Sequence, residues 1–292
     1  MKIGVTFPQT EIGSDPETVR EYARTAEKRG FDHLLAYDHV LGADRENWDG
    51  AYDIDDPFHE PLTLFSHLAA ETDDITFVSG ILILPQRQTA LVAKQAADVD
   101  RLSDGRLRLG VGLGWNHVEY EALGQAFASR SRRIEAQIPL LRQLWTERSV
   151  SVDDEWHTIR DAGLNPGPVQ RPIPLWMGGT ADPVLRRAAR LADGWLPQGD
   201  PGGVLDDRLD RLRGYLEAEG RDPESFAIVG RMNLGSPDAA DWAERVHAWR
   251  EVGASHLAID TMGIGLDLPA DHATVIERFA DAMSDAGIQL GQ

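Results

Sequence analysis

The feature of this sequence that most constrains its fold is a regular alternation of short, β-prone apolar runs with longer helical patterns. Strands that alternate with helices are joined by crossover connections, so they run parallel. Eight such units in a chain of 292 residues are typical of a (β/α)8 TIM barrel, an α/β fold. An open, doubly wound sheet is the structural alternative. The predicted strands are residues 2–7, 31–39, 75–84, 106–112, 174–179, 194–198, 226–232 and 255–260. The predicted helices are residues 16–29, 57–72, 89–102, 118–123, 130–146, 183–192, 204–219, 239–253 and 273–286.

One segment, residues 149–171, breaks this rhythm. Val150 and Val152 alternate with polar residues on one side of Asp153, and Trp156 and Thr158 do so on the other. Such alternation around a polar turn predicts an inserted β-hairpin. No internal repeat and no low-complexity linker is visible, so the sequence predicts a single domain over residues 1–292.

Charge and cysteine content exclude several classes of function. The net charge of −19 repels nucleic-acid phosphates and anionic lipid, so we expect neither as a partner. There is no cysteine, which excludes disulfides, thiolate metal sites and cysteine nucleophiles. No apolar run approaches the ~18 residues of a membrane span, and the N-terminus has no secretory pattern. We therefore expect a cytoplasmic protein without membrane contact.

Three glycines in "RLRLGVGLGWN", Gly110, Gly112 and Gly114, resemble a nucleotide-binding loop at first sight. A dinucleotide fingerprint requires G-x-G-x-x-G at the start of a helix, and neither register of this stretch provides it. On a strand, a period of two instead places the three Cα atoms on one face. The bare face either receives a ligand or makes room for large neighbours inside a narrow barrel.

A second glycine pair, Gly178–Gly179, ends a predicted strand in "WMGGTADP". Thr180 or Asp182 is positioned to cap the helix that follows. A helix N-terminus binds phosphate well, and barrels often carry a phosphate site on a late loop of this kind. An ordinary glycine turn is the alternative.

Two other strand ends carry small or polar residues. Asp38 and His39 follow the second strand, where His39 is a natural proton donor or acceptor and Asp38 a candidate for fixing its tautomer. Ser79–Gly80 ends the third strand and leaves room for a ligand.

Other chemistries lack their motifs. His59 and His67 do not have the spacing of a metal-binding pair, and we predict no metal site. No serine-hydrolase elbow and no phosphate-binding P-loop appears. The run Arg130–Arg133 is either a solvated helix start or a contact for an anionic tail.

At this point the chain resembles the luciferase-like flavin and deazaflavin oxidoreductase superfamily almost from end to end. The most specific segments are residues 81–124, which include the glycine strand, and residues 172–197, which include "WMGG". "YDHV", residues 37–40, is similar to the short Asp-His motif of the branch that uses the deazaflavin coenzyme F-420.

This resemblance implies a barrel that holds a flavin-type ring at the carboxyl ends of its strands. In relatives, residues matching Ser79 and Gly80 form a bulge behind the ring, often with a cis peptide bond that involves no proline. Further matches assign the cofactor's chain and phosphate to Gly112, Gly114, Asn116, Gly178, Gly179 and Thr180, and the edge of the ring to Asp38 and His39.

One position departs from the family pattern. The sugar-phosphate dehydrogenase branch has a catalytic carboxylate where this chain has Trp115, so we do not expect glucose-6-phosphate dehydrogenase activity. Trp48, Trp115, Trp195 and the loop of residues 42–56 are expected to shape the substrate pocket.

The resemblance leads to a hypothesis about the reaction. We expect hydride transfer between reduced coenzyme F-420 and a small organic substrate, with His39 as acid or base and Asp38 orienting it. The alternatives are an FMN-dependent monooxygenase and, in another class, a non-catalytic flavin-binding barrel. Relatives usually form dimers, so the resemblance also implies a homodimer.

Overall fold

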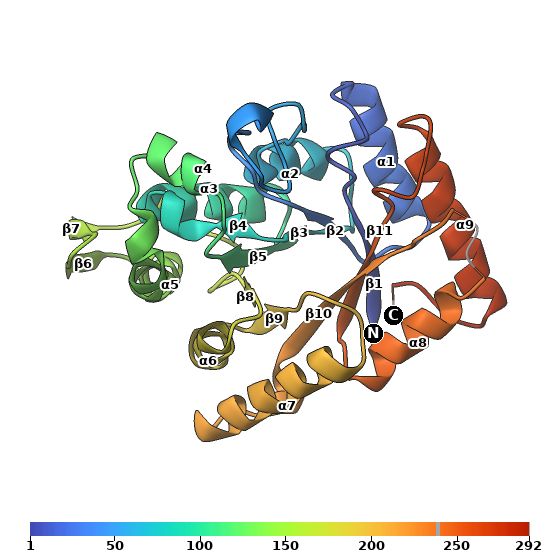
Figure 1. Cartoon of the computed structure of the whole chain (residues 1–292). Coiled ribbons are helices and arrows are strands. Elements are labelled where there is room, and N and C mark those ends of the chain that lie inside the picture. Colours follow the sequence, from blue (N-terminus) through green and yellow to red (C-terminus); the bar gives the residue numbers. More distant parts are fainter. Residues whose placement is uncertain (238–239, 292) are drawn as a thin grey trace.

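The computed structural model describes residues 1–237 and 240–291, and in that part of the chain nine parallel strands fill the eight positions of a closed barrel (Figure 1). β4 continues β3 along the same neighbour, β5. β1 pairs in parallel with both β2 and β11, so the sheet closes on itself. The TIM barrel is confirmed, and an open sheet is excluded. The strands are β1 (Lys2–Thr6), β2 (His33–Ala36), β3 (Thr76–Ser79), β4 (Leu82–Ile83), β5 (Leu107–Gly112), β8 (Leu175–Gly178), β9 (Gly194–Leu196), β10 (Ala227–Asn233) and β11 (His256–Asp260).

Helices surround the strands (Figure 1), and capping decides where several of them begin. Asp15 accepts the Thr18 amide, so the first helix starts at Pro16 as predicted. The second starts at Pro61, later than predicted, because Glu60 caps it by accepting the Thr63 amide. The predicted start of one helix at Ala239 lies outside the described residues. The helices are α1 (Pro16–Lys28), α2 (Pro61–Ala69), α3 (Thr89–Leu102), α4 (His117–Ala122), α5 (Arg130–Thr146), α6 (Asp182–Leu191), α7 (Gly203–Ala218), α8 (Trp242–Glu251) and α9 (Asp271–Asp285). Short 3₁₀ turns are η1 (Arg45–Asn47), η2 (Leu84–Gln86), η3 (Phe127–Ser129) and η4 (Pro223–Ser225).

The predicted insertion is an antiparallel hairpin of β6 (Val150–Asp153) and β7 (Thr158–Ala162), which projects to one side of the barrel (Figure 1). The ring Nε2 of His157 lies 2.7 Å from the Thr89 hydroxyl, which ties the hairpin to the start of α3. None of the helices in the described ranges is long and apolar enough to cross a membrane.

Successive residues of each strand face two different apolar layers, as a closed barrel requires. One set packs against the surrounding helices, and the alternate set fills the interior of the barrel. The interior set is Leu35, Val78, Trp176, Leu196, Val229 and Ala258.

The glycines of β5 face the break between β3 and β4. A Cβ at Gly110 would lie 2.0 Å from the Ser79 carbonyl oxygen, and one at Gly112 would lie 1.8 Å from Cδ1 of Ile81. Gly114 lies beyond the strand with φ of 64°. The expected cis peptide bond is present, between Gly80 and Ile81. Of the two explanations for the bare face, a ligand or large neighbours inside the barrel, the second accounts for Gly110 and Gly112. Their missing side chains make room for the end of β3 and for Ile81 beyond it.

At the N-terminal end of the barrel interior, two imidazoles face each other. The ring centroids of His33 and His256 are 5.6 Å apart, and Trp176 contacts His256 at 5.0 Å. Burial lowers the pKa of His256 to about 3 and also lowers the pKa of His33. Both rings are therefore neutral at pH 7.

We expect Gly110→Ala to destabilise the fold, because the new methyl group would meet a backbone oxygen that cannot rotate away. Overpacking of this kind costs about 1–3 kcal/mol or more in free energy of unfolding. In the described structure a Cβ at Gly214, inside α7, would meet no atom within 4 Å. Gly214→Ala is therefore the matched control and should stabilise by about 0.5–1 kcal/mol. Denaturant unfolding measures the stability of both variants. Equal unfolding midpoints for Gly110→Ala and Gly214→Ala would contradict the close approach of Gly110 to the Ser79 carbonyl oxygen.

Acid should destabilise the protein partly through His256. An unfolded His takes up a proton below its ordinary pKa of 6.5, whereas folded His256 does so only near pH 3. Stability is therefore lost as the pH falls through this window. Between pH 6.5 and about 4.5 the melting temperature of both proteins should fall. The fall should be smaller for His256→Gln than for the wild type, and the difference between the two falls should be roughly 2–4 °C. The exposed His67 provides the control His67→Gln, which should follow the wild type. Parallel curves for wild type and His256→Gln would refute the assignment.

Candidate active site

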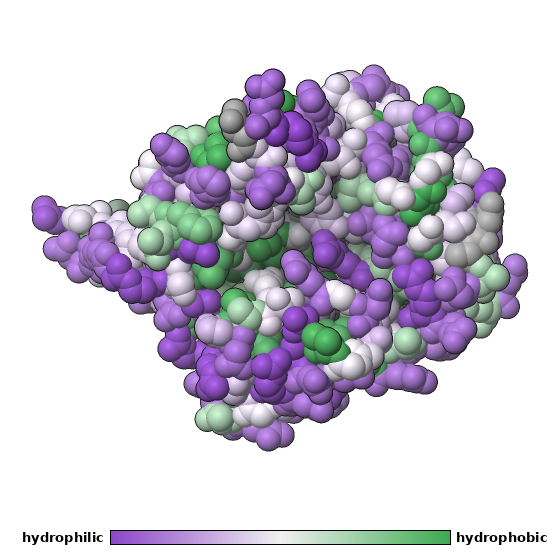
Figure 2. All heavy atoms as spheres, viewed as in Figure 1, coloured by the Kyte–Doolittle hydropathy of each residue, from purple (hydrophilic) through white to green (hydrophobic). Residues whose placement is uncertain are grey.

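The carboxyl ends of the barrel strands border two adjoining cavities of about 290 and 220 Å³. Figure 2 shows one face of the molecule hollowed near its centre, with hydrophobic residues at the floor and hydrophilic ones around it. Of the predicted site residues, the larger cavity contains Asp38, His39, Gly80, Gly114 and Asn116, and the smaller contains Gly80, Gly114, Gly178 and Gly179. The cavities share the wall formed by Gly80, Ile81, Gly114, Trp115, Gln198 and Arg231. The structure thus brings together most of the residues that the sequence singled out.

Three predicted site residues lie beside these cavities without lining them. Ser79 is buried beneath, where its hydroxyl donates to the Gly110 carbonyl at 2.8 Å. Gly112 is covered by Ile81. Thr180 is partly exposed at the entrance to α6. Their roles toward a cofactor stay predictions.

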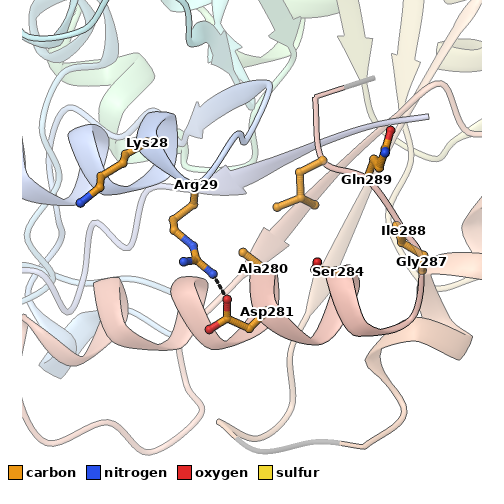
Figure 3. A pocket seen from close by; sticks show the side chains of 9 residues that line it. Lys28, Arg29, Ala280, Asp281, Ser284, Gly287, Ile288 and Gln289 are labelled. Atoms are coloured by element: carbon orange, nitrogen blue, oxygen red, sulfur yellow. Dashed lines mark hydrogen bonds and ion pairs between the residues drawn. The ribbon is translucent and has the colours of Figure 1, made fainter.

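A larger cavity of about 530 Å³ lies elsewhere, between α1, α9 and the C-terminal residues (Figure 3). The end of α1 leads into the start of β2, so this cavity is near the amino ends of the strands. Its facing charges, Arg29 and Asp281, form an ion pair with each other. Chemistry in barrels is found at the opposite end, so we place the site in the two smaller cavities.

Asp38 is held by partners other than His39. One carboxylate oxygen accepts from Arg87 at 2.6 Å and the other from the Ile83 amide at 2.8 Å. Arg87 also pairs with Glu60 at 3.1 Å. Burial raises the pKa of the Asp38 carboxyl, while Arg87 and the Ile83 amide oppose that shift. The expectation that Asp38 orients His39 is therefore wrong, because its two oxygens tie the end of β2 to β4 and to Arg87, the residue that follows η2.

Glu119 on α4 contacts His39 instead. Its Oε1 lies 3.2 Å from Nδ1 of His39 and also accepts the amides of Val40 and Leu41 at 2.7 and 3.3 Å. Sequence reasoning missed Glu119, although a signal was present. Asn116 caps α4 by accepting the Val118 amide, and an Asn-x-x-Glu spacing marks a capping box. In this structure the Glu119 side chain bonds to the loop that follows β2, whereas the Glu of a capping box bonds to the start of its own helix.

Aromatic rings surround His39. The ring centroids of Phe58, Tyr52 and Trp115 lie 4.8, 5.1 and 5.5 Å from that of His39. Trp48 stacks on Trp115 at 5.6 Å, so the loop of residues 42–56 covers this end of the site as predicted.

Trp195 takes no part in the pocket. It is fully buried, and its indole N–H donates to the Gly179 carbonyl at 2.7 Å. The prediction that it shapes the substrate pocket is wrong, because its strand position faces the helix layer.

The start of α6 is not capped by a side chain. Ala181 occupies the cap position, and the Asp182 carboxylate pairs with Arg186 and with the Tyr215 hydroxyl. The expected capping by Thr180 or Asp182 is therefore wrong. The backbone before α6 keeps the character of an anion site, since no side-chain oxygen competes for its amides.

Sequence reasoning also missed three polar residues of the cavities. Arg231 on β10 lies over the Tyr37 ring at 5.1 Å, and Tyr37 donates to Asp260 at 2.9 Å. Gln198 follows β9 and lines both cavities with Arg231. Arg231 could have been found from its parity, because alternate residues of a strand face the barrel interior.

Comparison with known proteins agrees with this geometry. The sequence profile of the family described as luciferase-like monooxygenase matches residues 1–288. An uncharacterised protein of Mycobacterium tuberculosis is 38% identical over 65% of this chain and 64% of its own length. The FMNH2-dependent dimethylsulfone monooxygenase of Pseudomonas putida is 29% identical over 69% of this chain and 54% of its own. The chain thus spans less than two thirds of either relative.

A solved structure extends the likeness in fold. An F420-dependent secondary alcohol dehydrogenase superimposes with a TM-score of 0.77 at 17% identity, covering 97% of this chain and 98% of the other. The profile match over residues 1–288, on a barrel that carries its cavities at the strand ends, shows that this chain belongs to the luciferase-like monooxygenase family, a family of flavin- or deazaflavin-dependent oxidoreductases.

Proposed function

We propose that this chain transfers hydride between reduced coenzyme F-420 and a small organic substrate in the two cavities at the strand ends. The observation that carries the proposal is what lies at the two ends of the adjoining cavities. A histidine held by a carboxylate lies at one end, and an uncapped helix start lies at the other. A flavin-type cofactor needs both a reacting edge with a proton source and a place for its phosphate.

The residues present fit such a cofactor. Gly179 and Thr180 precede the uncapped α6, where backbone amides favour a phosphate. Gly80 and Ile81 form the wall common to both cavities, where a flat ring has backbone and apolar side chain to rest on. Bound there, a deazaflavin supplies or accepts a hydride, and the protein provides binding, orientation and proton transfer.

His39 is the candidate acid or base. Hydride transfer to a carbonyl carbon requires a proton at the oxygen, and the reverse reaction requires its removal. His39 lines the larger cavity, and an imidazole can both donate and accept a proton there. Trp115 and Tyr52 pack against the ring, and the His39 side chain is 12% exposed.

An FMN-dependent monooxygenase is the second candidate. The Pseudomonas putida relative, which uses FMNH2, is the observation in its favour. The same cavities would serve, because the two cofactors share a ring shape and a phosphate. A non-catalytic flavin-binding barrel would not need the buried carboxylate that holds His39.

Cofactor titration separates these candidates. Apoprotein titrated by fluorescence should bind F-420 at least about ten-fold more tightly than FMN, a difference of about 1.4 kcal/mol. Thr180→Asp should weaken binding about ten-fold by placing a carboxylate beside the phosphate. Thr274→Asp puts the same charge near the start of α9 and should leave affinity unchanged. Tight FMN binding without F-420 binding would favour the oxygenase instead.

His39→Ala should slow turnover of reduced F-420 with small aldehydes and ketones by about 10²–10⁴-fold, because general acid–base catalysis contributes that much. Cofactor affinity should change little. His67→Ala, on the exposed side of α2, is the control. Asp38→Asn should mainly lower the melting temperature, because it weakens a buried ion pair with Arg87. Wild-type turnover by His39→Ala would refute the assignment.

A further inference from the structure

We propose that Glu119 is the positioning residue of His39: its carboxylate holds the proton on Nδ1 and leaves Nε2 to exchange a proton with the substrate. The exchange with substrate rests on the proposed function. The held tautomer is a property of the protein alone and is tested separately.

The tautomer follows from what each group is able to donate. Glu119 is 1% exposed, and its Oε1 lies 3.2 Å from Nδ1 of His39. An ionised carboxylate only accepts hydrogen bonds, so Nδ1 must carry the hydrogen. The amides of Val40 and Leu41 donate to the same oxygen, so Oε1 already serves as an acceptor for two neighbouring N–H groups.

Three aromatic rings confine the His39 ring. Tyr52, Phe58 and Trp115 all pack within 5.5 Å of the His39 ring, centroid to centroid. Nε2 makes no hydrogen bond within the described part of the chain, and His39 borders the larger cavity. The nitrogen without a partner is therefore the one available to a bound molecule.

The other charged or titratable groups around this cavity do not replace Glu119. Asp38 is engaged by Arg87 and the Ile83 amide. Burial raises the pKa of Tyr37 and of Tyr52, so both are neutral at pH 7. Arg231 lines the cavity as a cation and cannot accept a proton. Among the described residues that line the cavity, Glu119 is the carboxylate in contact with His39.

The tautomer is measured directly on the wild-type protein. Long-range proton–nitrogen correlation spectra of histidine-labelled protein distinguish protonated from bare ring nitrogens, and His39→Gln identifies the signal. We expect Nδ1 protonated and Nε2 bare in the neutral ring. A neutral ring protonated at Nε2 would overturn the proposal, whatever the behaviour of any Glu119 variant.

Glu119→Gln then separates positioning from simple capping. It keeps an acceptor for the Val40 and Leu41 amides but removes the charge beside His39. The titration midpoint of the His39 ring should move to lower pH by about one unit, a ten-fold loss of proton affinity. Glu121→Gln removes the same charge from an exposed position of α4 and should leave the midpoint in place. No movement in Glu119→Gln, or equal movement in both variants, would overturn the proposal.

Turnover with reduced F-420 tests the catalytic part. The acid limb of the pH–rate profile should move with the ring titration in Glu119→Gln. The double variant His39→Asn/Glu119→Gln should be no slower than His39→Asn, because the two act as one unit. Additive losses would assign Glu119 a separate structural role and overturn the pairing. A shifted ring titration without any turnover would support the positioning and refute the proposed function.

Discussion

The approach of the β5 backbone to the Ser79 carbonyl sets the floor of the candidate site. Gly110 has no side chain to separate the two strands, so the Ser79 oxygen occupies the space of a Cβ. Ile81 then lies between the backbones of Gly112 and Gly178, where a Cβ on either glycine would clash with it. The three strand positions without a side chain thus let Ser79 and Ile81 pack down onto the strands beneath the cavities. A side chain at any of these three positions would displace the Ser79–Ile81 segment, whose Gly80 and Ile81 line both cavities.

Two buried carboxylates hold the segment after β2 from opposite sides. Asp38 binds the Ile83 amide and Arg87, whereas Glu119 binds the Val40 and Leu41 amides. Buried carboxylates are costly unless paired, so both sets of bonds resist displacement. His39 lies between these two anchored points and is fixed by backbone on each side as well as by its own contact with Glu119. A proton-transferring group needs this placement, because small errors of position reduce its effect strongly.

The alternation of strands and helices was sufficient to predict the barrel and its inserted hairpin, because hydrophobic periodicity is a local signal. The site was predictable only where a residue stood at a strand end, as His39 and Gly179 do. The hydrogen-bond partners of these residues could not be predicted from the sequence. Asp38 adjoins His39 in sequence, yet its oxygens bond to Arg87 and Ile83. Its replacement, Glu119, comes from a helix 80 residues later. Trp195 faces the helix layer because its neighbour on the strand, Leu196, faces the barrel interior.

Trp115 stands where the resemblance implies a catalytic carboxylate in the sugar-phosphate dehydrogenase branch, and the buried carboxylate near His39 is that of Glu119 instead. Trp115 lines both cavities and packs on Trp48 and His39, so it covers the site instead of titrating in it. Glu119, four residues later, is 1% exposed. The contact of Glu119 with His39 is thus made by a carboxylate that is itself buried, next to the ring of Trp115. An acidic residue at position 115 would place a second carboxylate near His39 and open the site to solvent. The tryptophan instead presents an aromatic surface beside His39 at the wall of both cavities.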